Sequence, residues 1–173
     1  EKKFKLSVTF NKKNYLVSIL NILPKEMMFN EKYPYKSSES NTMKNSFKKL
    51  SNKIKNRFNT ENTLEIGSND GPFMKNFDKR KIVGIEPCKN LARITRAKGY
   101  KTICKYWNVD LAKKISKKKK FKLIYSANTL SHIKDISSIF KAIDVALDEE
   151  GVLILEDPSL LECLKNNAYD QFY

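Results

Sequence analysis

Two acidic residues, with a glycine-bracketed turn between them, are the residues of this sequence best placed to bind a nucleotide-type cofactor. Glu65 lies in a short apolar run, residues 63–66, and the turn GSNDG, residues 67–71, follows at once. A second apolar run ends at Glu86, nineteen residues after the first glycine of the turn. If both runs are parallel strands, their carboxyl ends and the turn border one crevice. The sequence therefore predicts a cofactor pocket at this point.

The residue types in the turn indicate which cofactor it suits. A pyrophosphate at a helix N-terminus needs the spacing G-x-G-x-x-G, whereas this turn has polar side chains and an Asp that would repel a phosphate. S-adenosylmethionine has a cationic sulfonium, a ribose diol and no phosphate, so carboxylates suit it. We expect Glu86 to accept both ribose hydroxyls through its two oxygens, and Glu65 to orient the turn and attract the cation. These features predict a class I methyltransferase.

Further cofactor contacts are expected beside the strand ends. Gly67 and Gly71 would let the backbone approach the methionine moiety. Asn108, after the third strand, is placed to reach the adenine amine, and Asn128, after the fourth, to line the methionine end. The complete expected cofactor set is Glu65, Gly67, Ser68, Asn69, Gly71, Glu86, Pro87, Asn108 and Asn128.

Alternating strand and helix patterns predict the α/β class, with a parallel, Rossmann-like doubly wound sheet covered on both faces. The expected strands are residues 63–66, 82–85, 101–104, 122–126 and 152–155. The expected helices after the turn cover residues 72–77, 89–98, 110–116 and 160–166, and a further one runs from the cap Asp135 to near Gly151. In the helix that Asp135 caps, the expected apolar face is Ile136, Ile139, Phe140, Ile143 and Leu147.

Residues 1–41 are expected to be an accessory region before a methyltransferase domain at 42–173. Residues 4–10 and 15–20 alternate as in a β-hairpin, and residues 22–41 read as loop with a helical turn near 26–29. From Thr42 a helix is predicted to pack on the sheet through Met43, Phe47, Leu50, Ile54 and Phe58. We expect a sheet truncated after about five strands and, with no initiator Met present, interpret the sequence as a fragment.

The amino-acid composition limits the kinds of binding partner that the chain can have. The 34 Lys and Arg residues exceed the 19 Asp and Glu residues, for a formal charge of +15, but nearly all are Lys and they are spread along the chain. We therefore expect a small-molecule substrate and no nucleic acid, with a basic nucleic-acid-binding module as an open alternative. Three isolated cysteines without C-x-x-C spacing fit a reducing compartment. With no run of eighteen apolar residues, we expect a cytoplasmic protein without a membrane partner.

Four stretches carry a resemblance to a known family. EIGSNDGPFMKNF, VGIEPCKNLARITRAKGYKTI, ANTLSHIKD and NNAYDQFY resemble the S-adenosylmethionine-dependent sugar C-methyltransferases, and so does the upstream segment EKYPYKSSESNTM. That family methylates a carbon of nucleotide-linked 4-keto-6-deoxy sugars, so the resemblance implies that substrate class. The match extends over nearly the whole chain, but it leaves the sugar, the nucleotide and the oligomeric state open.

The resemblance also implies catalytic residues. Forming the new bond requires that a proton leave the carbon beside the keto group and that the enolate oxygen be stabilised. The family's His after the fourth strand corresponds to His132, and the Tyr of its Y-x-E-H motif to Tyr173. Its tyrosine from the interdomain segment corresponds to Tyr33 or Tyr35, with Tyr35 preferred. The alternative hypothesis is methyl transfer to an oxygen or nitrogen, with His132 as base. A nicotinamide-dependent reductase is a third and weaker hypothesis, because the glycines that such enzymes need to bind a pyrophosphate are absent.

Two departures from the family pattern carry expectations of their own. The E-H half of the motif lies beyond the last residue, so the fragment is expected to be inactive. The family's amino-terminal domain binds zinc through paired C-x-x-C knuckles, but residues 11–14 here read NKKN. Because amides are poor zinc ligands beside thiolates, we expect no metal in this chain.

Overall fold

A parallel five-stranded sheet forms the centre of the computed structural model, which describes residues 4–5, 7–13 and 15–168. The strand order is β5-β4-β3-β6-β7. The strands are β3 (Thr63–Ile66), β4 (Ile82–Ile85), β5 (Lys101–Ile103), β6 (Phe121–Ala127) and β7 (Leu147–Glu156). Because β3 pairs with β4 on one side and β6 on the other, the chain direction across the sheet reverses at β3. Ligands of doubly wound folds bind at this reversal point.

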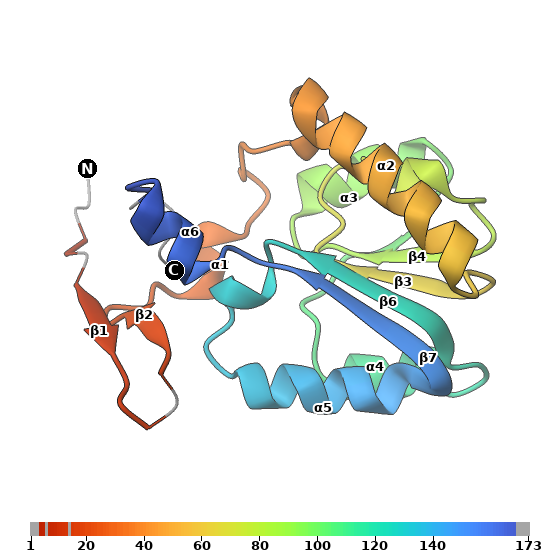
Figure 1. Ribbon diagram of the computed structural model, residues 1–173. Coiled ribbons are helices and arrows are strands. Elements are labelled where there is room, and N and C mark those ends of the chain that lie inside the picture. Colours follow the sequence, from red (N-terminus) through yellow and green to blue (C-terminus); the bar gives the residue numbers. More distant parts are fainter. Residues whose placement is uncertain (1–3, 6, 14, 169–173) are drawn as a thin grey trace.

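Helices cover both faces of the sheet, as the alternating pattern predicted. Figure 1 shows α2 (Asn41–Arg57) and α3 (Lys89–Ala97) over one face, and α4 (Val109–Ser116) and α5 (Ile136–Ala146) over the other. Each face has its own apolar cluster, one under α4 and α5 and one under α2. The expected α/β Rossmann-like fold is confirmed.

The first forty residues supply short elements beside the carboxyl ends of the strands. An antiparallel hairpin, β1 (Val8–Phe10) with β2 (Val17–Ile19), is followed by α1 (Lys25–Met28) and the 3₁₀ turn η1 (Ser37–Glu39). In Figure 1 the hairpin, α1 and the late helix α6 (Leu160–Lys165) lie together off this end of the sheet. The hairpin and the helical turn therefore form where the sequence predicted them.

Two expected helices differ in the structure. Residues 72–77 contain only a 3₁₀ turn, η2 (Met74–Asn76), because the side-chain amide of Asn76 donates to the carbonyls of Pro72 and Phe73. A continuing α-helix would need those carbonyls for its own ladder. Phe58, expected on the buried face of α2, instead follows the helix and is 38% exposed.

The second difference is the extent and face of α5. The helix ends at Ala146, and Leu147 already begins β7, which runs through Gly151. Ile136 and Phe140 are 40% and 43% exposed, whereas the buried positions are Ile139, Ala142, Ile143 and Ala146. The small side chains Ala142 and Ala146 lie in the apolar cluster where α5 packs against α4, whereas Ile136 and Phe140 lie at the boundary with solvent.

The packing of α2 gives a stability prediction. Phe47 is 5% exposed and meets the rings of Phe73 and Tyr125 edge-on at 6.1 Å and 6.5 Å. Phe47→Ala should therefore lower the free energy of unfolding by about 3–5 kcal/mol, measured by denaturant titration. The matched control Phe140→Ala removes the same atoms from an exposed helical site and should cost less than about 1 kcal/mol. Similar losses in the two variants would contradict this packing.

Candidate functional site

A cavity of about 800 Å³ opens at the carboxyl ends of β3, β4 and β6. Its walls come from the turn after β3, the residues after β4, the loop after β6 and the accessory segment from Ile22 to Ser37. This volume lies within the range that ligand pockets occupy. The reversal point of the sheet thus carries a ligand-sized cavity.

The turn after β3 is pressed against both neighbouring strands. Gly67 has φ +77°, and a Cβ there would lie 2.1 Å from Oγ1 of Thr129 in the loop after β6. In β4, a Cβ on Gly84 would lie 2.6 Å from Oγ of Ser68. Side chains at either glycine would push the turn away from the sheet, so both glycines keep it at the cavity floor.

The carboxylate of Glu86 is held in place by backbone donors. Its Oε2 accepts from the amide of Asn69 at 2.8 Å, and its Oε1 accepts from the amide of Cys88 at 2.8 Å. Each oxygen retains a second lone pair for a hydroxyl donor. Burial raises the pKa of Glu86 above its usual range, while the two backbone amides oppose that rise. The group is therefore a pre-oriented acceptor for a vicinal diol.

Glu65 is the less satisfied of the two carboxylates. It is 4% exposed and lines the same cavity, and its Oε2 has no hydrogen-bond partner among the described residues. Burial, and then the charge of Glu86, raise the pKa of Glu65 well above its usual value, against a weaker opposing effect of the Met74 amide. A buried carboxylate in this state is stabilised by a cation or a donor placed in the cavity.

Trp107 is a cavity residue that the sequence analysis missed. It is 6% exposed, lines the cavity, and its indole N–H has no partner within the described part of the chain. It is the one tryptophan of the sequence, directly before Asn108, and its place after the third expected strand was the available signal. Glu65 and Trp107 therefore each line the cavity and each have one buried polar atom, an acceptor and a donor, without a partner among the described residues. This polar pair, beside a fixed diol acceptor, fits S-adenosylmethionine.

His132 lines the cavity and ends the 3₁₀ turn η3 (Leu130–His132). Its ring is half-buried and meets the ring of Phe29 edge-on at 5.5 Å. Burial lowers the pKa of His132, and the negative charge of Asp157 partly opposes that shift. Near pH 7 the imidazole is therefore neutral and able to take up a proton.

Most of the residues singled out from the sequence meet in this cavity. Those that line it are Tyr33, Tyr35, Glu65, Gly67, Ser68, Asn69, Glu86, Pro87, Asn128 and His132. Gly71 does not line it: its missing Cβ would face Cγ2 of Thr95, at 2.9 Å, under α3. Tyr173 lies outside the described residues.

Two asparagines have structural partners in place of the expected cofactor contacts. Asn108 does not line the cavity, because its side-chain oxygen accepts from the amide of Leu111 at 2.8 Å and caps α4. Asn69 lines the cavity, but its side chain bonds the accessory segment and only its amide turns to Glu86. The side-chain oxygen of Asn108 is thus already used within the chain, and its expected contact with the adenine amine stays a prediction.

Comparisons with known proteins agree with the geometry. Residues 35–172 match the family model described as methyltransferase domain. The C-methyltransferase NovU of Streptomyces niveus is 25% identical over 176 residues, which cover 98% of this chain and 42% of NovU. The chain therefore spans less than half the length of this relative.

Solved structures of low identity share the fold. CalS10, an amino pentose methyltransferase from Micromonospora echinaspora solved with S-adenosylmethionine bound, has a TM-score of 0.55 at 16% identity, covering 68% of this chain and 52% of CalS10. The magnesium protoporphyrin IX methyltransferase ChlM from Synechocystis PCC 6803, also with bound S-adenosylmethionine, has a TM-score of 0.53 at 11% identity, covering 68% of this chain and 59% of ChlM. Among the helices that the structure describes, none combines the length and apolarity needed to cross a membrane.

The raised pKa of Glu65 has a consequence for stability. A carboxyl whose pKa is higher in the folded than in the unfolded state stabilises the fold at low pH, and this contribution is lost as pH rises through the folded-state value. Glu65→Gln should therefore unfold at a higher temperature than the parent at pH 8, with the difference shrinking toward pH 4, as followed by calorimetry without ligand. The exposed Glu61→Gln should show no such pH-dependent gain, and a Glu65→Gln protein less stable than the parent at pH 8 would contradict the assignment.

The single histidine allows a direct titration by NMR. Its ring resonances should give a midpoint below 6.5, because burial disfavours the imidazolium. Asp157→Asn should lower the midpoint further, since that carboxylate favours the charged form. The control Asp135→Asn changes a carboxylate that caps α5 and should leave the midpoint unchanged. A midpoint above 6.5, or one raised in Asp157→Asn, would show that the ring is placed differently.

Proposed function

Because the chain belongs to the methyltransferase-domain family and S-adenosylmethionine is its cofactor, we propose that it methylates a carbon next to the keto group of a nucleotide-linked deoxysugar. One observation carries the proposal. Glu65 and Glu86, from adjacent strands, line the same cavity as Tyr33, Tyr35 and His132. Carboxylates that can bind the cofactor thus line the same cavity as side chains that can take up or donate a proton at the acceptor.

The cofactor would be held by the residues at the tips of β3 and β4. Glu86, fixed by two backbone amides, would accept the ribose hydroxyls, and Glu65 with the Gly67 turn would hold the methionine part. Trp107, which lines the same cavity, would offer its indole N–H to the bound cofactor. When bound, S-adenosylmethionine supplies an electrophilic methyl group.

The acceptor would occupy the side of the cavity formed by the accessory segment and η3. Carbon methylation needs removal of a proton from the carbon beside the keto group, so that its electron pair can form the new bond to carbon. A neutral His132 can hold a proton there. The hydroxyls of Tyr33 and Tyr35 can donate to the oxygen on which negative charge develops.

Relatives support a carbon acceptor on a sugar. NovU is named a C-methyltransferase, and CalS10 is an amino pentose methyltransferase. The second candidate is transfer to an oxygen or nitrogen, which CalS10's amino sugar favours and for which a neutral His132 would serve as base. The atom that carries the new methyl group in the product separates the two candidates.

The cofactor assignment is tested by calorimetry with S-adenosylhomocysteine. We expect the parent to bind it and Glu86→Ala to bind at least tenfold more weakly, about 1.4 kcal/mol or more, because the diol loses its acceptor. Glu150→Ala changes a glutamate whose side chain is 88% exposed near the start of β7, and should retain the parent affinity. If Glu86→Ala and Glu150→Ala bind equally well, the carboxylate does not hold the ribose.

A further inference from the structure

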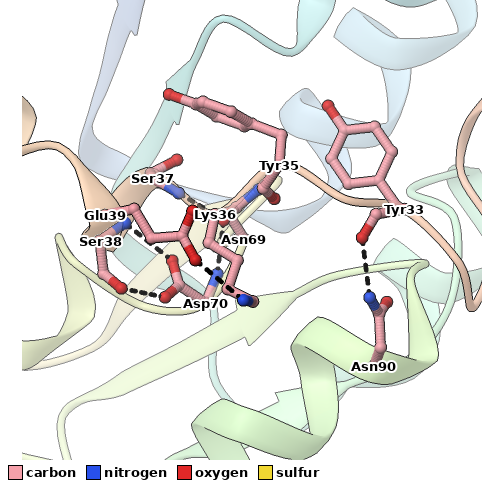
Figure 2. Close-up of polar contacts among 9 residues, drawn as sticks. All are labelled: Tyr33, Tyr35, Lys36, Ser37, Ser38, Glu39, Asn69, Asp70 and Asn90. Carbon is pink, nitrogen blue, oxygen red and sulfur yellow. Dashed lines mark hydrogen bonds and ion pairs between the residues drawn. The ribbon is translucent and has the colours of Figure 1, made fainter.

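The side chains of Asn69 and Asp70 face the accessory segment. Oδ1 of Asn69 accepts from the amide of Ser37 at 2.9 Å, and its Nδ2 donates to the carbonyl of Tyr35 at 3.3 Å. Asp70 accepts from both donors of Ser38, the amide at 3.1 Å and the hydroxyl. Figure 2 shows these contacts joining the turn after β3 to the segment. Two residues of the cofactor turn thus hold a stretch of chain more than thirty residues away in sequence.

The segment held in this way carries both candidate tyrosines, and we call residues 33–39 the tyrosine strap. In Figure 2 the rings of Tyr33 and Tyr35 extend from one side of the strap, away from the Asn69 and Asp70 contacts. A third anchor comes from α3, where the amide of Asn90 donates to the carbonyl of Tyr33 at 2.8 Å. The strap is therefore fastened by its backbone, and both tyrosines line the cavity.

Asn69 links the strap to the cofactor carboxylate. Its own amide donates to Glu86 at 2.8 Å while its side chain holds Tyr35 and Ser37, an arrangement that its left-handed backbone, φ +48°, makes possible. Asn tolerates this conformation better than most residues. A ligand that fixes Glu86 must therefore also fix the residue that holds the strap.

Asp70 is too buried to be an incidental surface contact. It is 2% exposed, and a carboxylate out of water needs donors that Ser38 supplies twice. The ion pair of Lys36 with Glu39, at 2.9 Å, spans the same part of the strap. The Asp in the turn thus has a role besides the repulsion of phosphate that its residue type suggests.

We propose that Asn69 and Asp70 are positioning residues that hold Tyr33 and Tyr35 over the cavity, and that cofactor binding at Glu86 tightens this hold. The inference rests on the proposed function, because the tyrosines matter to catalysis only if the acceptor lies in that cavity. The turn after β3 would thus connect the part of the cavity that binds the cofactor to the part that binds the acceptor. The tyrosines would then reach their working position most fully when the cofactor is present.

Hydrogen exchange of the Ser37 and Ser38 amides, resolved by NMR, tests the coupling. Saturating S-adenosylhomocysteine should slow exchange at both amides by about fivefold or more in the parent. In Asp70→Ala this ligand-dependent slowing should disappear at the Ser38 amide, which loses its acceptor, while affinity for the ligand falls by no more than the same factor, as linkage requires. A residue that only stabilises the fold would give no ligand-dependent difference.

A second variant keeps the test decisive if Asp70→Ala does not fold. Ser38→Ala removes one bond from the strap side and should lose part of the slowing, whereas Ser46→Ala on an exposed position of α2 should keep all of it. Binding of the ligand without slowed exchange, or full slowing in Ser38→Ala, would overturn the inference and leave the proposed function intact. Failure of the parent to bind the ligand would remove the proposed function and the inference with it.

Discussion

The site depends on the burial of two carboxylates beside one cavity. Glu65 lies in β3 and Glu86 directly follows the adjacent parallel strand β4, both are 4% exposed, and each has a raised pKa because burial disfavours its charge. Like charges in a low-dielectric space are tolerated only where donors or a cation offset them. A sulfonium with a ribose diol offers both, whereas a pyrophosphate would add to the repulsion.

A few features of the fold are enough to place these two carboxylates. Because β3 lies between β4 and β6, the turn after β3 can contact residues that follow both neighbours. Two glycines allow the close approach, at Gly67 toward Thr129 and at Gly84 toward Ser68. Backbone amides then orient Glu86, so the site is held by the main chain, which does not depend on side-chain rotamers. The accessory segment closes the other side through Asn69 and Asp70.

The local sequence pattern predicted the secondary-structure elements well where burial of a short apolar run alone determined the element. The spans of β3 and β4 were obtained because short apolar runs bounded by turn residues have few other solutions. Pattern failed where a polar side chain could serve either a ligand or the chain itself. Asn108 has the polarity of a ligand residue but caps α4, and the partners of Asn69 and Asp70 lie on a segment that no spacing rule connects to the turn. Trp107 was missed because an aromatic side chain after a strand usually indicates a residue of the hydrophobic core.

The position of the bound ribose decides whether Glu86 is the acceptor for its hydroxyls. A crystal structure of the chain with S-adenosylhomocysteine measures this directly. We predict both ribose hydroxyls within hydrogen-bonding distance of the Glu86 carboxylate, with the methionine part beside Glu65 and the Gly67 turn. A ligand bound elsewhere, or a ribose that contacts neither oxygen of Glu86, would contradict the central claim.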